Sequence, residues 1–308
     1  TSYTEAAQRL YQLLLAPIAE HLTGQIIIVP DDILSNIPFE ALLSAAPARV
    51  GNFATYPFWI KDKQISYAYT ATLLKEMQEK RRSLLPNSSI LAMAPFYRDQ
   101  QLQLKEYNRG GNLTLDSLAT LNASGLEVQT IIKTINGQSY YGTQATLEKY
   151  RLEAPHYRII HLATHGVADY QTGDFAYLAF SIANDPGAFA KLYARELYYT
   201  NLNAEMVVLS ACETGTGKLK EGEGVISLGR GFAYAGAKSV FTTLWQVRDE
   251  ETKNLVVDFY KNLKSGANKA TALRRAKLNF LTEHSTVSNH PFFWAGLIGN
   301  GDMSPLFR

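Results

Sequence analysis

Cysteine is nearly absent from this chain of 308 residues, which carries only Cys212. A single cysteine cannot form a disulfide within the chain, so the sequence predicts a reducing, cytoplasmic setting. No apolar run reaches the length of a bilayer span, and residues 1–10 lack the basic start and apolar core of a signal peptide. Because the chain begins at Thr1 rather than Met, we expect a fragment of a longer protein or a processed product.

An excess of charge of either sign is also lacking. The 30 basic and 28 acidic residues give a net charge of +2. The basic residues are scattered, and local groups such as those at 80–82 and 274–275 are typical of solvated helix faces. The sequence therefore predicts no direct contact with nucleic acid and no membrane association.

Apolar runs alternate with stretches of helical periodicity along most of the chain. The apolar and β-branched runs predict strands at residues 26–29, 66–69, 90–94, 139–141, 158–164, 177–181, 206–210, 239–244 and 294–298. Helical spacing predicts helices at 3–22, 37–43, 72–82, 118–135, 143–152, 225–234, 250–263 and 267–281. A polar segment at 96–116 is expected to be a surface loop. This alternation predicts an α/β fold with a mostly parallel sheet covered by helices on both faces.

Two of the predicted strands end near a reactive side chain. The run Ile159–Thr164 leads into His165, and Val207–Ser210 leads, one residue later, into Cys212. Chemistry in open α/β sheets gathers at the carboxyl ends of strands. If these strands are neighbours, His165 and Cys212 face one another, and a thiol needs a nearby imidazole to become a competent thiolate. The alternative is a buried, inert cysteine, which Glu213 favours because a neighbouring carboxylate raises a thiol pKa.

A second histidine, His161, lies four residues before His165 in the same strand, so alternation places both on one face. We expect His161 to be a hydrogen-bonded core residue that can also help to orient the site. The spacing of the two histidines suits zinc on a helix, but they lie on a strand and Leu162 stands where glutamate is needed. The segment 215–218 likewise lacks the residues of a phosphate-binding loop. No metal and no cofactor are expected.

His165-Gly166, with Cys212 placed 47 residues after the histidine, resembles the caspase arrangement of a histidine about 50 residues before the nucleophile. Motifs spread over the whole chain resemble the CHAT domain family, caspase-clan peptidases often joined to tetratricopeptide repeats. These motifs are Val29-Pro30-Asp31, Ile37–Leu42, His161–Gly166, Leu209–Gly215, Gly222–Val225, Ala235–Ala237, Leu244–Val247 and His290–Ala295.

The resemblance implies a fold and a set of roles. It implies a caspase-like sheet with a degenerate pseudo-caspase half at residues 1–135 and an active half at 136–308. Cys212 matches the nucleophile and His165 the general base. The backbone N–H groups of Gly166 and Cys212 match the oxyanion site. No third carboxylate is required.

Specificity is harder to read from the sequence. Some caspase-clan enzymes that cut after basic residues have aspartate two positions before the cysteine, and caspases have glutamine there, whereas this chain has Ser210. Asp249 resembles an acid of separases that receives an arginine side chain, and the alternative is an N-cap for the helix predicted from Glu250. Ser210, Glu213 and Asp249 are the predicted substrate-binding residues, and we predict cleavage after arginine or lysine.

The resemblance thus implies a caspase-like cysteine endopeptidase that acts on a protein partner. Family members occur in bacterial programmed-death and antiviral systems, some beside gasdermin-like proteins, so an effector of that kind is an expected substrate. A repeat region or partner before Thr1 is an expected regulator. The alternative function is a catalytically silent interaction domain that keeps the fold, and a Cys212→Ala variant separates the two.

Overall fold

The structure is a computed structural model. It describes residues 2–49, 51–80, 87–97, 120–211, 215, 217–220, 224–245, 249–283 and 289–307. Within these ranges only the backbone is described at 87–89, 186–187, 218–220, 224–226 and 249–252.

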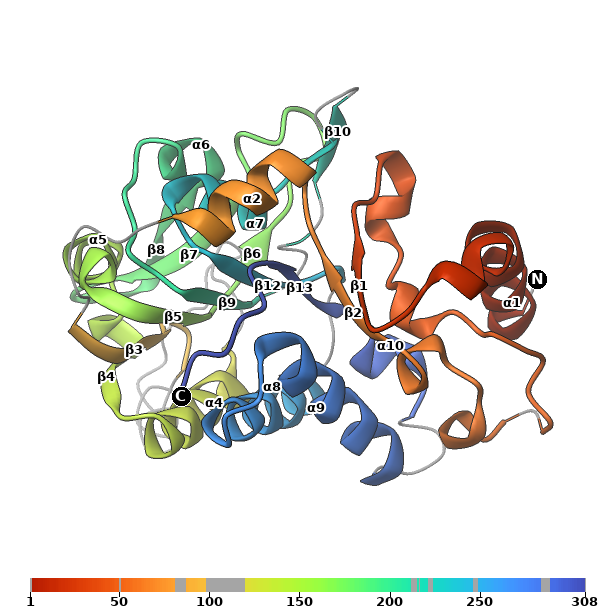
Figure 1. Cartoon of the computed structure of the whole chain (residues 1–308). Helices are drawn as coiled ribbons and strands as arrows, with labels where there is room; N and C mark the ends of the chain where they lie inside the picture. The colour runs from red at the N-terminus through yellow and green to blue at the C-terminus, as the bar shows by residue number, and fades with distance from the viewer. Residues whose placement is uncertain are drawn as a thin grey trace.

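An eight-stranded sheet runs through the molecule (Figure 1). In spatial order its strands are β1 (Gln25–Ile28), β2 (Gln64–Tyr67), β13 (Leu297–Gly301), β12 (Ser239–Thr243), β9 (Met206–Ser210), β5 (Tyr157–Ala163), β3 (Asn87–Ala94) and β4 (Gly137–Tyr141). Neighbouring strands are parallel except β12 and β13, which are antiparallel. The carboxyl ends of β12, β9, β5, β3 and β4 therefore meet at one edge of the sheet.

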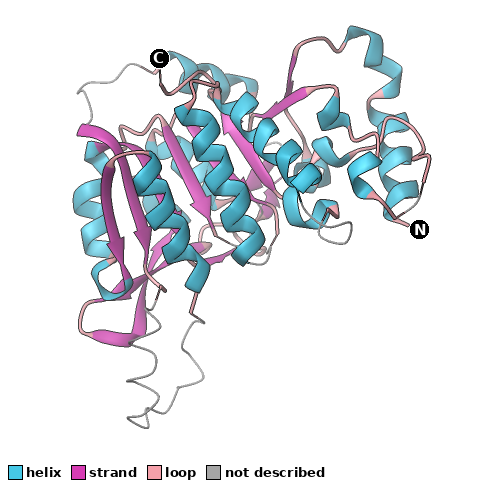
Figure 2. Cartoon of the chain, turned by 90° about the horizontal axis from the view of Figure 1, so that it is seen from below, coloured by secondary structure: helices cyan, strands magenta, loops and turns pink. Residues whose placement is uncertain are grey.

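Helices cover both faces of this sheet, as Figures 1 and 2 show. One face carries α4 (Asn122–Thr134), α8 (Asp249–Lys264) and α9 (Lys269–Glu283). The other carries α2 (Ala71–Glu79), α5 (Leu147–Glu153), α6 (Ala194–Leu197) and α7 (Leu228–Ala235). Within the described ranges, no helix combines the length and the apolar character that crossing a membrane requires. The predicted α/β class, with a mostly parallel sheet between two helical layers, is confirmed.

The central strands β5 and β9 are mostly apolar because helices cover both of their faces. Along β5, Ile159 and Ala163 enter the core under α4 and α8, whereas Ile160 and Leu162 enter the core on the opposite face. The residues of β9 alternate in the same way. Because both faces are covered, every position of such a strand is buried, and an apolar run replaces the apolar–polar alternation of a half-exposed strand.

The amino-terminal block of residues 3–61 lies beside the β1 edge of the sheet (Figure 1). It contains α1 (Tyr3–Leu14) and the short 3₁₀ helices η1 (Ala16–His21), η2 (Asp32–Asn36), η3 (Phe39–Ala41), η4 (Phe53–Thr55) and η5 (Trp59–Lys61). Two further 3₁₀ turns, η6 (Gly142–Gln144) and η7 (Ala154–His156), and the one-turn helix α10 (Pro291–Trp294) lie later in the chain. The predicted helix at 3–22 is therefore interrupted, because Pro17 has no N–H to continue the helical ladder.

A buried polar cluster ties this block to α9. Lys277 Nζ lies 2.9 Å from Glu40 Oε1, and both side chains are almost fully buried. The Tyr67 hydroxyl donates to Glu40 and accepts from the Phe39 N–H at 2.8 Å. Burial lowers the pKa of Lys277, and the Glu40 carboxylate opposes that effect. Glu40, in the motif Ile37–Leu42, thus forms a structural ion pair with a lysine that lies 237 positions later in the sequence.

Two small antiparallel sheets lie outside the main one. The first contains β6 (Gly166–Val167), β7 (Tyr177–Ile182) and β8 (Asp185–Tyr193), and the second contains β10 (Lys218–Lys220) and β11 (Gly224–Ile226). Strand β8 was not predicted. The helix predicted from Val225 begins later, because Ser227 caps α7 by accepting from the Arg230 N–H at 3.3 Å. The strand predicted from Trp294 also begins later, since Trp294 ends α10.

Strands from both sides of residue 135 belong to the same eight-stranded sheet. The division into a degenerate half at 1–135 and an active half at 136–308 stays a prediction. Most of the loop predicted at 96–116 lies outside the described residues.

Candidate active site

The strands that precede His165 and Cys212 are direct neighbours. β5 and β9 pair in parallel with Ala163 opposite Ser210. His165 lies two residues beyond Ala163, and Cys212 lies two residues beyond Ser210. Both strands therefore end at the same edge of the sheet, and each predicted catalytic residue follows its last paired residue by two positions in the sequence. Cys212 and Glu213 themselves lie outside the described residues, so the structure describes the two strand ends and not the thiol.

His165 occupies a partly exposed position in the turn that joins β5 to β6. Its ring meets Phe96 edge to face, with 4.8 Å between centroids and 71° between planes. Phe96 follows the carboxyl end of the neighbouring strand β3. The His165 carbonyl accepts from the Ala179 N–H of β7 at 2.9 Å. The ring of Phe96 thus contacts the side chain of the predicted base, and the hydrogen bond from Ala179 holds its backbone.

The predicted oxyanion donor follows directly. Gly166 begins β6 and pairs with Leu178 of β7, while Thr164 on the other side of His165 donates its hydroxyl to the Ala179 carbonyl at 2.6 Å. The three residues from Thr164 to Gly166 are therefore held by β7. The second predicted donor, the N–H of Cys212, lies outside the described residues.

The segment around Cys212 is fastened on both sides to Thr243, the last residue of β12. The Thr243 hydroxyl donates to the Ala211 carbonyl, and the Thr243 carbonyl accepts from the Gly215 N–H at 2.9 Å. A side chain at Gly215 would place its Cβ 2.7 Å from the Thr242 hydroxyl, so any other residue there would force Thr242 to shift. The hydrogen bonds of Thr243 therefore fix the positions of Ala211 and Gly215, the described residues on either side of 212–214.

Sequence reasoning missed Phe96 and Thr243. Both lie at the carboxyl ends of strands that border the pair β5 and β9, and that position is the signal that could have found them. Ser210 was predicted to contact substrate, and it lies partly buried at the end of β9.

The end of β12 leads into a partly exposed aromatic pair. Trp245 stacks on Phe292 with 6.1 Å between centroids and 15° between planes, and its indole N–H donates to the Phe292 carbonyl at 2.8 Å. Residues 246–248 are outside the described ranges, and α8 then begins at Asp249. The Asp249 side chain is not described either, so its two predicted roles, in substrate binding and in capping, stay predictions.

His161 belongs to the core and not to the site. It is fully buried between β5 and the helices α4 and α8. Its Nε2 lies 2.8 Å from Glu127 Oε1 in a geometry that is not aligned for a hydrogen bond, and its Nδ1 lies 3.2 Å from the Tyr260 hydroxyl. Burial and the Glu127 carboxylate raise the pKa of Tyr260 well above its ordinary value. This is the environment expected for His161.

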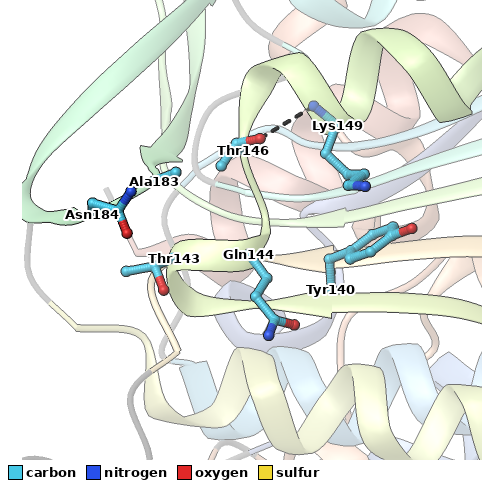
Figure 3. Close-up of a pocket in the computed structure, with 7 residues that line it drawn as sticks. All are labelled: Tyr140, Thr143, Gln144, Thr146, Lys149, Ala183 and Asn184. Atoms are coloured by element: carbon cyan, nitrogen blue, oxygen red, sulfur yellow. Dashed lines mark hydrogen bonds between the residues drawn. The ribbon is translucent and has the colours of Figure 1, made fainter.

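A pocket of about 430 Å³ lies elsewhere on the molecule (Figure 3). It is lined by Tyr140, Thr143, Gln144, Thr146, Lys149, Ala183 and Asn184. The Lys149 N–H donates to the Thr146 hydroxyl at 3.1 Å, and its Nζ lies 5.2 Å from the Tyr140 ring centroid. No residue predicted for catalysis lines this pocket. Within the described residues, no cluster of three or more His, Cys, Asp or Glu side chains could hold a metal ion.

A model of the CHAT domain matches residues 4–302, nearly the whole chain. The chain belongs to the CHAT domain family.

Curated relatives of this CHAT domain include tetratricopeptide repeat protein 28 from mouse and from human. Each is 33% identical over 111 residues, which cover 35% of this chain and 4% of the relative. The chain therefore spans only a small part of the curated relatives that it matches.

Solved structures similar to this CHAT domain include two caspase-clan peptidases. The separase–securin complex of Saccharomyces cerevisiae matches 90% of this chain and 16% of that chain, with a TM-score of 0.54 and 12% identity. The Arg-specific cysteine proteinase gingipain R matches 99% of this chain and 68% of that chain, with a TM-score of 0.55 and 11% identity. At these identities the likeness shows the fold alone, and the fold of this CHAT domain is caspase-like.

Proposed function

We propose that this CHAT domain is a cysteine endopeptidase in which Cys212 is the nucleophile and His165 the general base. The observation that carries the proposal is the parallel pairing of β5 with β9, with Ala163 opposite Ser210. His165 and Cys212 each follow a paired residue by two positions in the sequence, and the two paired strands end at the same edge of the sheet, which supports the assignment. The caspase-like fold supports the same assignment, because that fold is a known scaffold for acyl transfer.

The proposed mechanism is acyl transfer to sulfur. His165 takes the proton of Cys212, and the thiolate attacks the scissile carbonyl. The N–H groups of Gly166 and Cys212 stabilise the tetrahedral oxyanion. His165 then protonates the departing amine, and water hydrolyses the thioester to release the carboxyl product and the free thiol.

The experiment compares wild type with Cys212→Ala and Cys212→Ser. Fluorogenic peptides with arginine, lysine, aspartate or leucine before the scissile bond serve as substrates. We expect cleavage by the wild type and a loss of at least about 10³-fold in both variants, because neither side chain supplies a thiolate. Equal cleavage by wild type and Cys212→Ala would show that another group, or a contaminant, does the chemistry. A folded wild type without any cleavage would favour the silent interaction domain.

Cleavage after arginine or lysine is proposed on Asp249. Its backbone lies at the start of α8, four residues beyond Trp245 at the exit of β12. A carboxylate at that edge would pair with a basic side chain of the substrate. An Asp249→Asn variant should lose the preference for arginine while its cleavage of leucine substrates stays the same. A substrate profile that is unchanged in the variant would assign Asp249 to the helix start instead.

We further propose that a repeat region or another protein partner controls the domain. Tetratricopeptide repeat proteins among the relatives support this proposal. The amino-terminal block also leaves Leu13, Ile18, Ile27, Val29 and Ile33 between 43% and 66% exposed. A gasdermin-like substrate, a bacterial programmed-death or antiviral setting and a cytoplasmic location stay predictions.

A further inference from the structure

The small sheet that follows His165 has one buried and one outer face. Leu178 and Phe180 of β7 and Leu192 of β8 point into the core. Residues that alternate with these point the other way, and some of them, with Phe175 and with Arg195 of α6, form a set that we call the β8 ladder. Its members are Phe175, Tyr177, Phe189, Lys191, Tyr193 and Arg195. Ala179 and Ser181, on the same face of β7, are buried. At every second position from Phe189 to Arg195, an aromatic residue is followed by a basic one.

The rings of the ladder hold its two cations in place. Lys191 Nζ lies 4.6 Å from the ring centroid of Tyr177 and 5.6 Å from that of Phe189. The Arg195 guanidinium lies 4.7 Å from the Phe175 centroid and 5.3 Å from the Tyr193 centroid. Such cation–π contacts restrict side chains that are otherwise flexible. Cations that are already positioned lose less entropy when an anionic partner binds.

Neither cation is neutralised by the described part of the chain. No described carboxylate forms an ion pair with Lys191 or Arg195. Glu196, which follows Arg195, is bound instead to Arg151 at 2.7 Å. Phe175 is 50% exposed beside Arg195. The outer face of the hairpin therefore presents two positive charges on an aromatic surface.

We propose that the β8 ladder binds an extended acidic segment of a partner polypeptide. Lys191 lies in β8 and Arg195 in the following helix α6, and the rings that hold them meet where the Tyr177 and Tyr193 centroids are 5.9 Å apart. An extended partner with two carboxylates a few residues apart can pair with both cations. Single-stranded nucleic acid fits less well, because base stacking needs ring faces that Lys191 and Arg195 already cover.

The ladder starts beside the candidate active site. Tyr177 pairs with Val167, which is two residues after His165, and Leu178 pairs with Gly166. A segment held on the ladder would lie next to the strand that follows the predicted base. The proposal goes beyond peptidase activity, because binding at this face does not depend on a reactive Cys212.

The test is a binding measurement on the full chain in a Cys212→Ala background. The probe is a short fluorescein-labelled peptide with two glutamates four residues apart between alanines and threonines, followed by anisotropy. The test variant is Lys191→Gln/Arg195→Gln. Its matched control is Lys75→Gln/Lys133→Gln, which removes the same charge from two exposed lysines on α2 and α4. A Phe175→Ala variant probes the rings without touching the core.

We expect saturable binding that weakens with salt and falls at least about fivefold in Lys191→Gln/Arg195→Gln, with the control unchanged. Phe175→Ala should weaken binding as well, at an unchanged melting temperature. Equal losses in the test and control variants, or no binding by the peptide, would overturn the proposal. Tighter binding of an oligouridylate than of the peptide would overturn it in favour of nucleic acid.

Discussion

His161 and His165 lie four residues apart on one segment of chain, yet their surroundings have little in common. His161 is fully buried inside β5, and both of its ring nitrogens face side chains, Glu127 from α4 and Tyr260 from α8. His165 lies beyond the end of the strand, partly exposed, between Phe96 and the backbone of β7. A polypeptide substrate could reach only the second imidazole.

The comparison shows that position relative to the strand end separates the two roles. Inside the sheet, an ionisable side chain must be paired because water is absent, so it contributes to stability. At the carboxyl end, the backbone is anchored while the side chain is left for chemistry. Interior ionisable groups should therefore affect stability with little effect on activity, and strand-end groups should do the opposite.

The largest expected effect is on activity, from His165→Ala. Loss of the base should lower kcat/KM by about 10³-fold or more, while the free energy of unfolding changes by less than about 1 kcal/mol. The measurement pairs cleavage of a fluorogenic peptide with urea denaturation. His156→Ala is the control, since His156 is an exposed histidine that ends η7, directly before β5. A variant that keeps most of its activity would remove His165 as the base.

The mirror experiment is Glu127→Ala. It leaves His161 and the Tyr260 hydroxyl in the core without the carboxylate, and we expect a loss of about 3 kcal/mol in the free energy of unfolding. Activity per folded molecule should stay within about twofold. Glu148→Ala on exposed α5 is the control and should change stability by less than about 0.5 kcal/mol. If Glu127→Ala is as stable as this control, the contact between Glu127 and His161 does not stabilise the fold.

Lys269 extends the comparison to pH. Burial lowers the pKa of Lys269 from 10.5 to about 8, and its Nζ donates to the Asp302 carbonyl at 2.8 Å. The unfolded chain binds the proton more tightly, so the contribution of Lys269 to the free energy of unfolding should increase by about 3 kcal/mol as the pH rises from 8 to 10.5. A Lys269→Met variant should lose that increase, whereas Lys261→Met, at an exposed position of α8, should keep it. Parallel pH profiles of wild type and Lys269→Met in urea denaturation would contradict the assignment.

The smallest effect is expected at Asp169, in the loop after β6. Its carboxylate accepts from the Thr172 hydroxyl at 2.6 Å and from the N–H groups of Gln171 and Phe175 at 2.9 and 3.2 Å, which lowers its pKa to about 2. Asp169→Ala should cost less than about 1 kcal/mol, because these exposed donors can bind water instead. In wild type, the contribution is present above about pH 4 and is lost as the pH falls towards 2. Hydrogen exchange of the 169–175 amides at pH 6 would show the difference, and equal rates in both proteins would contradict it.

The sequence predicted the central strands well, because β5 and β9 are mostly apolar runs of the kind that a doubly covered sheet buries. Their pairing was a condition of the predicted site, and the structure meets it. Strand β8 was missed because aromatic and basic residues alternate on its outer face and give no simple apolar pattern. Thr243 and Phe96 were missed because their contacts join strands far apart in sequence. The roles of Cys212 and Asp249 were predicted from family motifs, and strand geometry alone does not supply them.

Thr243 holds Ala211 with its hydroxyl and Gly215 with its carbonyl, and this has a consequence for how the domain can vary. Neither hydrogen bond uses a side chain of residues 212–214. Substitution of residue 212 should therefore leave both anchors in place, whereas a side chain at Gly215 would meet the Thr242 hydroxyl at 2.7 Å. A relative that has lost the cysteine should still carry glycine three positions later.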